Sequence, residues 1–281
     1  MSAKKILIIG NGFLGKKCAA AWPEAILSDK LLYTVKDVED LLDEYKPDSV
    51  LNAAGIVGKP NVDWCEDHQL ETIAGNTTLP IMIAEACQKK GVYLLHMGTG
   101  CIFYGYSSDP KGWKESDHPN PMAVYTRSKY AADLVLSTLP NVGIARIRMP
   151  IDAEPSPGNL IDKLASFKRV VDVVNSVTVV EDMISVFKQL LERQAAGIFH
   201  VTNPGAIKHK EILEMYTEIV DPTHVNEWIS AQDLVDTGLA KKTRSNTILS
   251  SENLEKLGIQ MREVHEAVRE TMKKYAVLKN K

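Results

Sequence analysis

The sequence contains few cysteines, and their spacing forms no recognised pattern. Among its 281 residues there are four, without any C-x-x-C pair: Cys18, Cys65, Cys87 and Cys101. This spacing argues against a zinc site and against a disulfide scaffold. No apolar run is long enough to span a bilayer. The N-terminus lacks the apolar core and small-residue cleavage site of a signal peptide. We therefore expect a reduced, cytoplasmic protein that binds no metal.

The charge balance excludes two further classes of partner. The net charge is −3, with 25% charged and 44% hydrophobic residues, which is an ordinary globular composition. Such a balance gives no reason to expect nucleic acid or an anionic membrane as a partner. A chain of this length can form one large domain or two modest ones.

Short apolar runs alternate with helical patterns in the first half of the chain. Runs near 5–9, 25–27, 49–52, 92–97 and 142–148 read as buried strands. Helices are expected over 16–22, 37–45, 71–90 and 125–139. This alternation predicts an α/β fold with a Rossmann-type, doubly wound parallel sheet.

A glycine turn joins the first expected strand to the first expected helix. Gly10, Gly12 and Gly15 form G-x-G-x-x-G, with Phe13 and Leu14 between the last two glycines. In this context the turn predicts binding of a dinucleotide pyrophosphate at the start of the helix. Asn52, Ala53 and Ala54 end another strand, and we expect them to leave room for the same cofactor. The acid and the cation in Ser28-Asp29-Lys30 leave NAD and NADP open.

Three reactive side chains are expected to converge near residues 94–129. Thr99 follows an apolar run, and Tyr125 and Lys129 lie four residues apart, on one face of a helix. A phenol can protonate a ketone that accepts hydride, a hydroxyl can hold its oxygen, and an ammonium should lower the pKa of the phenol. The pair Tyr-x-x-x-Lys alone could equally be an exposed tyrosine and lysine.

The composition and the pattern of expected elements change after Pro150. Residues 152–158 are rich in proline, and mostly short helices are expected beyond them, at 159–167, 181–193, 210–220, 231–238, 251–257 and 262–275. A short strand is expected over 170–174, and a strand over 197–201 that rejoins the main sheet. We predict a cofactor-binding domain over 1–150, with a return around 175–203, and a smaller substrate-binding lobe over 151–281.

Several strings together resemble a known family. The glycine turn, Asn52-Ala53-Ala54-Gly55, Thr99 and Tyr125-x-x-x-Lys129 resemble the extended short-chain dehydrogenase/reductases. More specific strings resemble the plant-type bifunctional UDP-4-keto-6-deoxyglucose 3,5-epimerase/4-reductases, which make UDP-L-rhamnose and are related to the dTDP-4-dehydrorhamnose reductases. These strings are Gly-Ile-Val-Gly-Lys-Pro-Asn-Val-Asp-Trp-Cys-Glu at 55–66, Thr-Gly-Cys-Ile-Phe at 99–103, Arg-Ile-Arg-Met-Pro-Ile at 146–151, and Asn-Pro-Gly at 203–205 followed by Glu-Ile-Leu-Glu-Met-Tyr at 211–216.

The resemblance implies a reaction and further site residues. The substrate would be UDP-4-keto-6-deoxy-D-glucose, with a dTDP sugar as the alternative, and the cofactor NADPH, with NADH as the alternative. Cys101 and Lys163 would move the protons at C3 and C5, although without the resemblance they read as core filler and a solvated helix residue. Substrate contacts are expected from Asn61, Trp64, Asn76 and Arg244, of which Trp64 could equally be core and Arg244 a surface residue. A homodimer formed by the helices 71–90 and 125–139 is also implied.

The chain departs from the family pattern in three places, one of which is the segment between Cys101 and Lys163, whose loops are shorter here. The extended family usually has G-x-x-G-x-x-G, and the segment around the second strand is shorter here. Two alternative functions remain open: a monofunctional dTDP-4-dehydrorhamnose reductase, and a non-catalytic nucleotide-binding regulatory subunit on the same fold. Cys101 favours the bifunctional enzyme over the first, and the intact Thr99, Tyr125 and Lys129 argue against the second.

Overall fold

A computed structural model describes residues 4–59 and 61–279 of the chain. Pro60, inside the string at 55–66, therefore lies outside the described residues. The chain divides into two compact units. The first takes the described residues up to Ile102 with Ala123–Arg146 and Ile184–Phe199, and the second takes Phe103–Met122, Ile147–Met183 and the described residues from His200 onward. The expected domain boundary near residue 150 stays a prediction, because compact units are no test of independent folding.

A six-stranded parallel sheet forms the centre of the first unit, which confirms the predicted Rossmann-type fold. Its order is β2-β1-β3-β4-β5-β10. The strands are β1 Ile6–Ile9, β2 Ala25–Ser28, β3 Ser49–Asn52, β4 Tyr93–Thr99, β5 Val142–Ile147 and β10 Gly197–His200. The order reverses between β1 and β3, and the carboxyl ends of strands at such a reversal are where ligands bind in this class of sheet.

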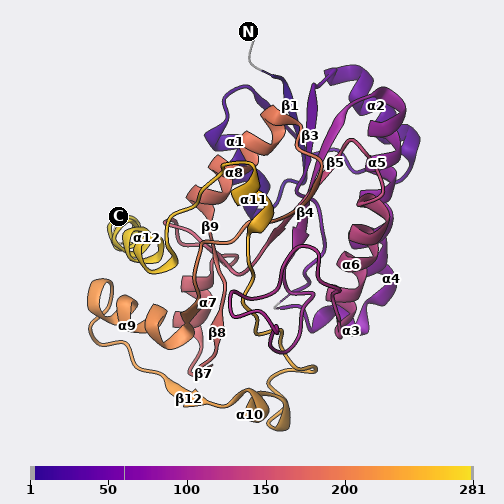
Figure 1. Cartoon of the computed structure of the whole chain (residues 1–281). Helices are drawn as coiled ribbons and strands as arrows, with labels where there is room; N and C mark the ends of the chain where they lie inside the picture. Colours follow the sequence, from indigo (N-terminus) through magenta and orange to yellow (C-terminus); the bar gives the residue numbers. More distant parts are fainter. Residues whose placement is uncertain (1–3, 60, 280–281) are drawn as a thin grey trace. The chain divides into compact units, whose positions relative to one another are not determined.

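Helices cover both faces of this sheet, which explains why β1 and β3 are buried along their whole length. On one face lie α2, α5 and α6, and on the other α1 and α8 (Figure 1). Their bounds are α1 Phe13–Ala21, α2 Val35–Tyr45, α5 Leu79–Lys90, α6 Val124–Leu136 and α8 Val180–Arg193. The main apolar cluster of the unit includes Leu7, Leu41, Ile83, Leu94 and Ile144.

Two predicted helices differ from the structure. The first helix begins at Phe13, three residues earlier than expected, so Phe13 and Leu14 belong to its first turn. The single helix expected over 71–90 is instead interrupted: α4 Gln69–Ile73 runs into a π-helical segment, η1 Ala74–Thr78, before α5 begins. A separate short helix, α3 Trp64–Asp67, precedes them. Periodicity missed the interruption because a π turn adds one residue without breaking the run of helix-forming residues.

The second unit combines helices with three pairs of very short strands. These pairs are β6 Pro150–Ile151 with β9 Thr178–Val179, β7 Arg169–Val171 with β12 Glu227–Ile229, and β8 Val174–Asn175 with β11 Ile207–Lys208. The helices are α7 Leu160–Ser166, α9 His209–Ile219, α10 Ala231–Asp236, α11 Glu252–Lys256 and α12 Val264–Lys279. Leu164, Ile212, Tyr216, Val268 and Met272 form part of its own core. The single strand expected over 170–174 is divided into β7 and β8, which pair with different partners. The other short strands carry too little alternation for the sequence to reveal them.

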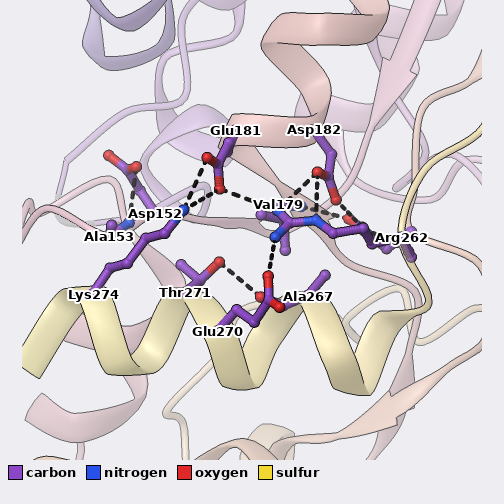
Figure 2. A network of polar contacts seen from close by, with 11 residues as sticks. Asp152, Ala153, Val179, Glu181, Asp182, Arg262, Ala267, Glu270, Thr271 and Lys274 are labelled. Carbon is purple, nitrogen blue, oxygen red and sulfur yellow. Dashed lines mark hydrogen bonds and ion pairs between the residues drawn. The ribbon is translucent and has the colours of Figure 1, made fainter.

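An ion-pair network fastens α12 to the first turn of α8 within the second unit (Figure 2). Arg262 Nε donates to Asp182 Oδ1 at 2.9 Å, and its guanidinium also contacts Glu181 and Glu270. Lys274 Nζ lies 2.7 Å from Glu181 Oε2. The central Arg262–Asp182 pair is partly shielded from solvent, so it should contribute more than a fully exposed pair. No helix in the described part of the chain combines the length and apolar character needed to cross a membrane.

Candidate active site

The glycine turn between β1 and α1 closes tightly on the loop after β3. Gly10 adopts a φ of +115°, and a Cβ there would lie 2.3 Å from the backbone nitrogen of Ala54. A Cβ at Gly15 would lie 2.0 Å from the carbonyl oxygen of Gly10. At both positions only glycine fits, because a side chain would strike backbone atoms that cannot move aside.

Gly12 is different, since a Cβ there would meet no atom of the described residues within 4 Å. Gly12 is also the N-cap of α1, and within the described chain no side chain caps this helix and no acid lies in its first turn. Its N–H groups therefore remain available to an anion, as the pyrophosphate of a dinucleotide requires. The residues of this turn fit a nicotinamide dinucleotide.

Asn76 and Asn52 fix the loop that follows β3. Asn76, in the π-helical η1, accepts from the backbone nitrogen of Ile56 and donates to its carbonyl oxygen, both at 2.8 Å. Asn76 also donates to the Ser128 hydroxyl on α6 at 3.3 Å. Asn52 Oδ1 accepts from the Ala54 nitrogen at 3.0 Å. The amides thus tie the loop to α6, and the fully buried Asn76 uses its side chain for positioning.

Thr99 and Tyr125 meet where α6 packs against the end of β4. Thr99 is the last residue of β4 and is 4% exposed, and Tyr125 lies in the first turn of α6. The Thr99 hydroxyl lies close enough to the Tyr125 phenol to lower its pKa. The backbone nitrogen of Cys101 donates to Thr99 Oγ1 at 3.2 Å, and the Cys101 thiol lies close enough to raise the pKa of the phenol. The threonine hydroxyl, the phenol and the thiol are therefore grouped.

Lys129 lies one helical turn after Tyr125 and is 5% exposed. Its Nζ donates to the Met97 carbonyl oxygen at 2.8 Å and lies 3.5 Å from His96 Nε2. Burial lowers the pKa of Lys129 from 10.5 to about 8, and the Asp133 carboxylate partly opposes this. Asp133 itself is fully buried and accepts from Arg146 Nε at 2.8 Å. The site therefore contains a lysine that loses its proton far more readily than an exposed one.

The predicted lowering of the phenol's pKa is wrong for this structure. Burial raises the pKa of Tyr125, the Cys101 thiol adds to the rise, and the hydrogen bond with Thr99 lowers it. Lys129 directs its Nζ at Met97 and His96, and its own charge is disfavoured by burial. Tyr125 is consequently protonated at neutral pH, which suits a proton donor.

The remaining predicted residues lie in different places. Within the first unit, Trp64 stacks on His68 with ring centroids 3.7 Å apart, and exposed Asn61 accepts from the Asp63 nitrogen at 2.8 Å. In the second unit, the exposed Lys163 lies on α7, where desolvation of its ammonium lowers its pKa, and Arg244 is half-buried in the segment between α10 and α11. Their contacts with substrate stay predictions.

Sequence reasoning missed His96, Asp133 and Arg146. His96 and Asn52 are register partners on β4 and β3, with Asn52 Nδ2 3.0 Å from His96 Nδ1. The available signal was a polar residue inside each of two apolar strands, where a buried polar group needs a partner. Asp133 and Arg146 gave a similar signal, one on the expected helix and the other in the next strand.

Comparisons with known proteins identify the family of this chain. A family model described as RmlD substrate binding domain matches residues 6–277. A bifunctional dTDP-4-dehydrorhamnose 3,5-epimerase/dTDP-4-dehydrorhamnose reductase of Arabidopsis thaliana is 37% identical over 219 residues, covering 76% of this chain and 73% of that protein. The crystal structure of a UDP-rhamnose synthase from Acanthamoeba polyphaga mimivirus is 28% identical, with a TM-score of 0.89 over 97% of this chain and 100% of that one.

Other relatives are longer or more distant. A trifunctional UDP-glucose 4,6-dehydratase/UDP-4-keto-6-deoxy-D-glucose 3,5-epimerase/UDP-4-keto-L-rhamnose-reductase of Arabidopsis thaliana is 32% identical. The match covers 99% of this chain but 42% of that protein, so this chain spans less than half of its length. A dTDP-4-dehydrorhamnose reductase from Bacillus anthracis, solved with NADP, shares the fold with a TM-score of 0.81 at 22% identity, covering 96% of this chain and 99% of that one.

Proposed function

We propose a function that proceeds from one premise: the chain belongs to the RmlD substrate-binding-domain family. It is an enzyme that reduces the 4-keto group of a 6-deoxy nucleotide sugar with NADPH. The observation that carries the proposal is the grouping of the Thr99 hydroxyl with the Tyr125 phenol at the end of β4, with Lys129 one turn further along α6. A protein that only bound nucleotides would have no use for a protonated phenol held in this way.

The residues of the chain perform the acid chemistry of the reduction. NADPH, when bound, supplies a hydride to C4 of the sugar. Tyr125, kept protonated by burial, donates its proton to the C4 oxygen as negative charge develops there. Thr99 holds the same oxygen through its hydroxyl, which stabilises the charge in the transition state. Gly10, Gly12, Gly15 and the α1 N-terminus would hold the pyrophosphate, with Asn52, Ala53 and Ala54 beside it.

We extend the proposal to epimerisation at C3 and C5 before the reduction. The ketone at C4 acidifies the protons on both neighbouring carbons, so a base and an acid on opposite faces of the sugar can invert them. Cys101 is the proposed base, because its thiol lies beside the phenol that would hold the enolate oxygen. Lys163 is the proposed second group, because the resemblance implies a lysine at this position and desolvation lowers the pKa of its ammonium. UDP-L-rhamnose is the product of the two reactions.

The second candidate is a monofunctional dTDP-4-dehydrorhamnose reductase. The grouping of Thr99, Tyr125 and Lys129 favours this candidate, because reduction of the ketone requires no thiol. The Arabidopsis thaliana protein that carries both activities in its name supports the bifunctional proposal. Asn61, Trp64 and Arg244 are the proposed substrate contacts in either case. The predicted contact by Asn76 is not proposed again, because its buried amide is used to position the loop after β3.

A homodimer is proposed through α5 and α6. A groove lies between these helices, and its lining combines apolar residues with polar and charged ones: Ile81, Ala84, Val135 and Leu139 with Glu85, Gln88 and Lys89. Val135 is 45% and the neighbouring Leu134 53% exposed. Exposed apolar residues on two adjacent helices suit packing against the same helices of a second copy.

A product assay separates the candidates. The protein is mixed with NADPH and either UDP-4-keto-6-deoxy-D-glucose or dTDP-4-keto-L-rhamnose, absorbance at the NADPH band is followed, and sugars are identified by NMR. Formation of UDP-L-rhamnose from the unepimerised sugar supports the bifunctional enzyme. Turnover of the L-sugar alone supports the monofunctional reductase. Cofactor binding without turnover of either sugar would refute both.

A further inference from the structure

The His96 imidazole lies beside the Lys129 amine, and the neighbours of this imidazole fix its protonation state. Asn52 Oδ1 accepts from the backbone nitrogen of Ala54 at 3.0 Å. A backbone N–H cannot accept, so this contact fixes the orientation of the Asn52 amide and directs Nδ2–H at His96 Nδ1, 3.0 Å away. Nδ1 of His96 is therefore an acceptor without a proton.

The other ring nitrogen of His96 then faces the lysine as a donor. His96 is fully buried, and burial followed by the nearby Lys129 charge lowers its pKa well below 6.5, so the ring is neutral. A neutral imidazole without a proton on Nδ1 carries it on Nε2. Nε2 lies 3.5 Å from Lys129 Nζ, so an N–H group points at the amine nitrogen.

This arrangement distinguishes the two charge states of Lys129. The ammonium has three donors, of which one is satisfied by the Met97 carbonyl oxygen, but it cannot bond to another donor. The neutral amine has a lone pair that can accept from His96 Nε2–H. The charged groups that surround the amine are Asp133, which favours the ammonium, and Arg146, which neutralises Asp133.

We propose that Asn52 and His96 are positioning residues that hold Lys129 poised to release its proton. The inference rests on the proposed reductase function and adds two residues to it. When Tyr125 has protonated the sugar oxygen, the Lys129 ammonium, whose Nζ is directed at Met97 and His96, releases a proton to water. Water returns a proton to the Tyr125 phenolate, the Tyr125 O–H bond re-forms, and the resulting amine accepts the His96 hydrogen bond. Solvent later returns a proton to the amine, so the cycle balances.

The test begins with the unliganded wild-type protein. Two-bond nitrogen–proton correlation spectra of ¹⁵N-histidine-labelled protein report which ring nitrogen of His96 carries the proton, with His96→Gln used to assign the signal. We expect a protonated Nε2 and a bare Nδ1 throughout the range from pH 6 to 9. A His96 with its proton on Nδ1, or a doubly protonated ring at pH 6, would overturn the proposal whatever the activity.

Variants then connect the tautomer to catalysis. His96→Leu removes the Nε2–H donor that faces the Lys129 ammonium. Asn52→Asp draws the His96 proton from Nε2 to Nδ1. In both variants the ammonium is therefore more stable and the pKa of Lys129 rises. The basic limb of the kcat–pH profile should move upward by about one pH unit, a tenfold change in proton affinity. His96→Gln keeps an amide donor toward Lys129 and an acceptor toward Asn52, so it should retain the wild-type limb.

Controls separate this inference from the function on which it rests. The exposed histidine variant His265→Leu should leave the profile unchanged. If the basic limb of the kcat–pH profile does not move in His96→Leu and Asn52→Asp, the inference is wrong and the reductase function stands. A wild-type protein that binds NADPH but turns over no sugar would refute the function, while the NMR measurement would still report the tautomer. If His96→Leu does not fold, the wild-type spectra and Asn52→Asp decide.

Discussion

Asn76 holds Ile56 at both of its backbone groups, with Oδ1 2.8 Å from the nitrogen and Nδ2 2.8 Å from the oxygen. The two residues are twenty positions apart, one in the π-helical turn and one in the loop beside the cofactor site. The π turn directs this side chain inward, so a local irregularity of the helix shapes a loop that the sheet alone does not fix.

Replacing Asn76 by alanine should therefore destabilise the fold. Asn76→Ala leaves both backbone groups of Ile56 without their partner, and we expect a loss of about 2 kcal/mol in the free energy of unfolding. Urea titration followed by circular dichroism measures this. The exposed variant Asn61→Ala should change stability by less than about 0.5 kcal/mol. Equal losses in the two variants would contradict the role given to Asn76.

Lys129 should lower stability at neutral pH. Its folded pKa of about 8 lies below its usual 10.5, so the unfolded chain holds the proton more tightly and stability rises as pH increases from 8 to 10.5. Lys129→Met removes the buried charge but also the bond to Met97, and should gain about 2 kcal/mol at pH 7. The gain should disappear by pH 10.5 in unfolding measurements. The exposed Lys36→Met should show no gain, and a gain in Lys129→Met that is constant with pH would contradict this account.

Tyr125→Phe should stop the reduction and spare cofactor binding. Loss of a positioned proton donor lowers kcat by about 10²- to 10⁴-fold. NADPH oxidation gives kcat, and quenching of protein fluorescence gives the NADPH affinity, which should change little. Tyr130→Phe, on the same helix, is the matched control and should keep wild-type kcat. Wild-type kcat in Tyr125→Phe would remove Tyr125 from the mechanism.

Cys101→Ala should separate the two proposed activities. We expect this variant to reduce an already epimerised L-sugar but to form no UDP-L-rhamnose from UDP-4-keto-6-deoxy-D-glucose, as read by NMR of the products. Cys18→Ala is the matched control, because burial raises the pKa of the Cys18 thiol to about 12 and makes it inert. Continued production of UDP-L-rhamnose by Cys101→Ala would assign the base elsewhere.

The buried pair of Asp133 and Arg146 should be strongly coupled. Asp133→Leu leaves the Arg146 guanidinium buried without its carboxylate, which costs about 3–5 kcal/mol. The double variant Asp133→Leu/Arg146→Met should recover much of that loss, since no unpaired charge remains. Urea unfolding of the single and double variants gives the coupling energy. Simple additivity of the two single variants would show that the pair acts independently.

The amino-acid sequence by itself determined the class of fold and indicated that Thr99, Tyr125 and Cys101 lie close together. Apolar runs, a glycine turn between strand and helix, and the four-residue spacing of Tyr125 and Lys129 are local patterns. Local patterns are readable because backbone geometry fixes how neighbours in sequence are placed. The parallel sheet, the return of 197–201 to it as β10, and the meeting of α6 with β4 follow from these patterns and from right-handed crossovers.

Only the tertiary structure decided the electrostatic character of the site. The partners of Asn52 and Asn76 are 44 and 20 residues distant, and Asp133 meets Arg146 across two elements. The direction of the Tyr125 pKa shift was wrong in the sequence reading because burial and the neighbouring Cys101 thiol raise this pKa, and burial depends on every element that packs over the side chain. Sequence proximity places the reactive groups, and packing decides which of them carry protons.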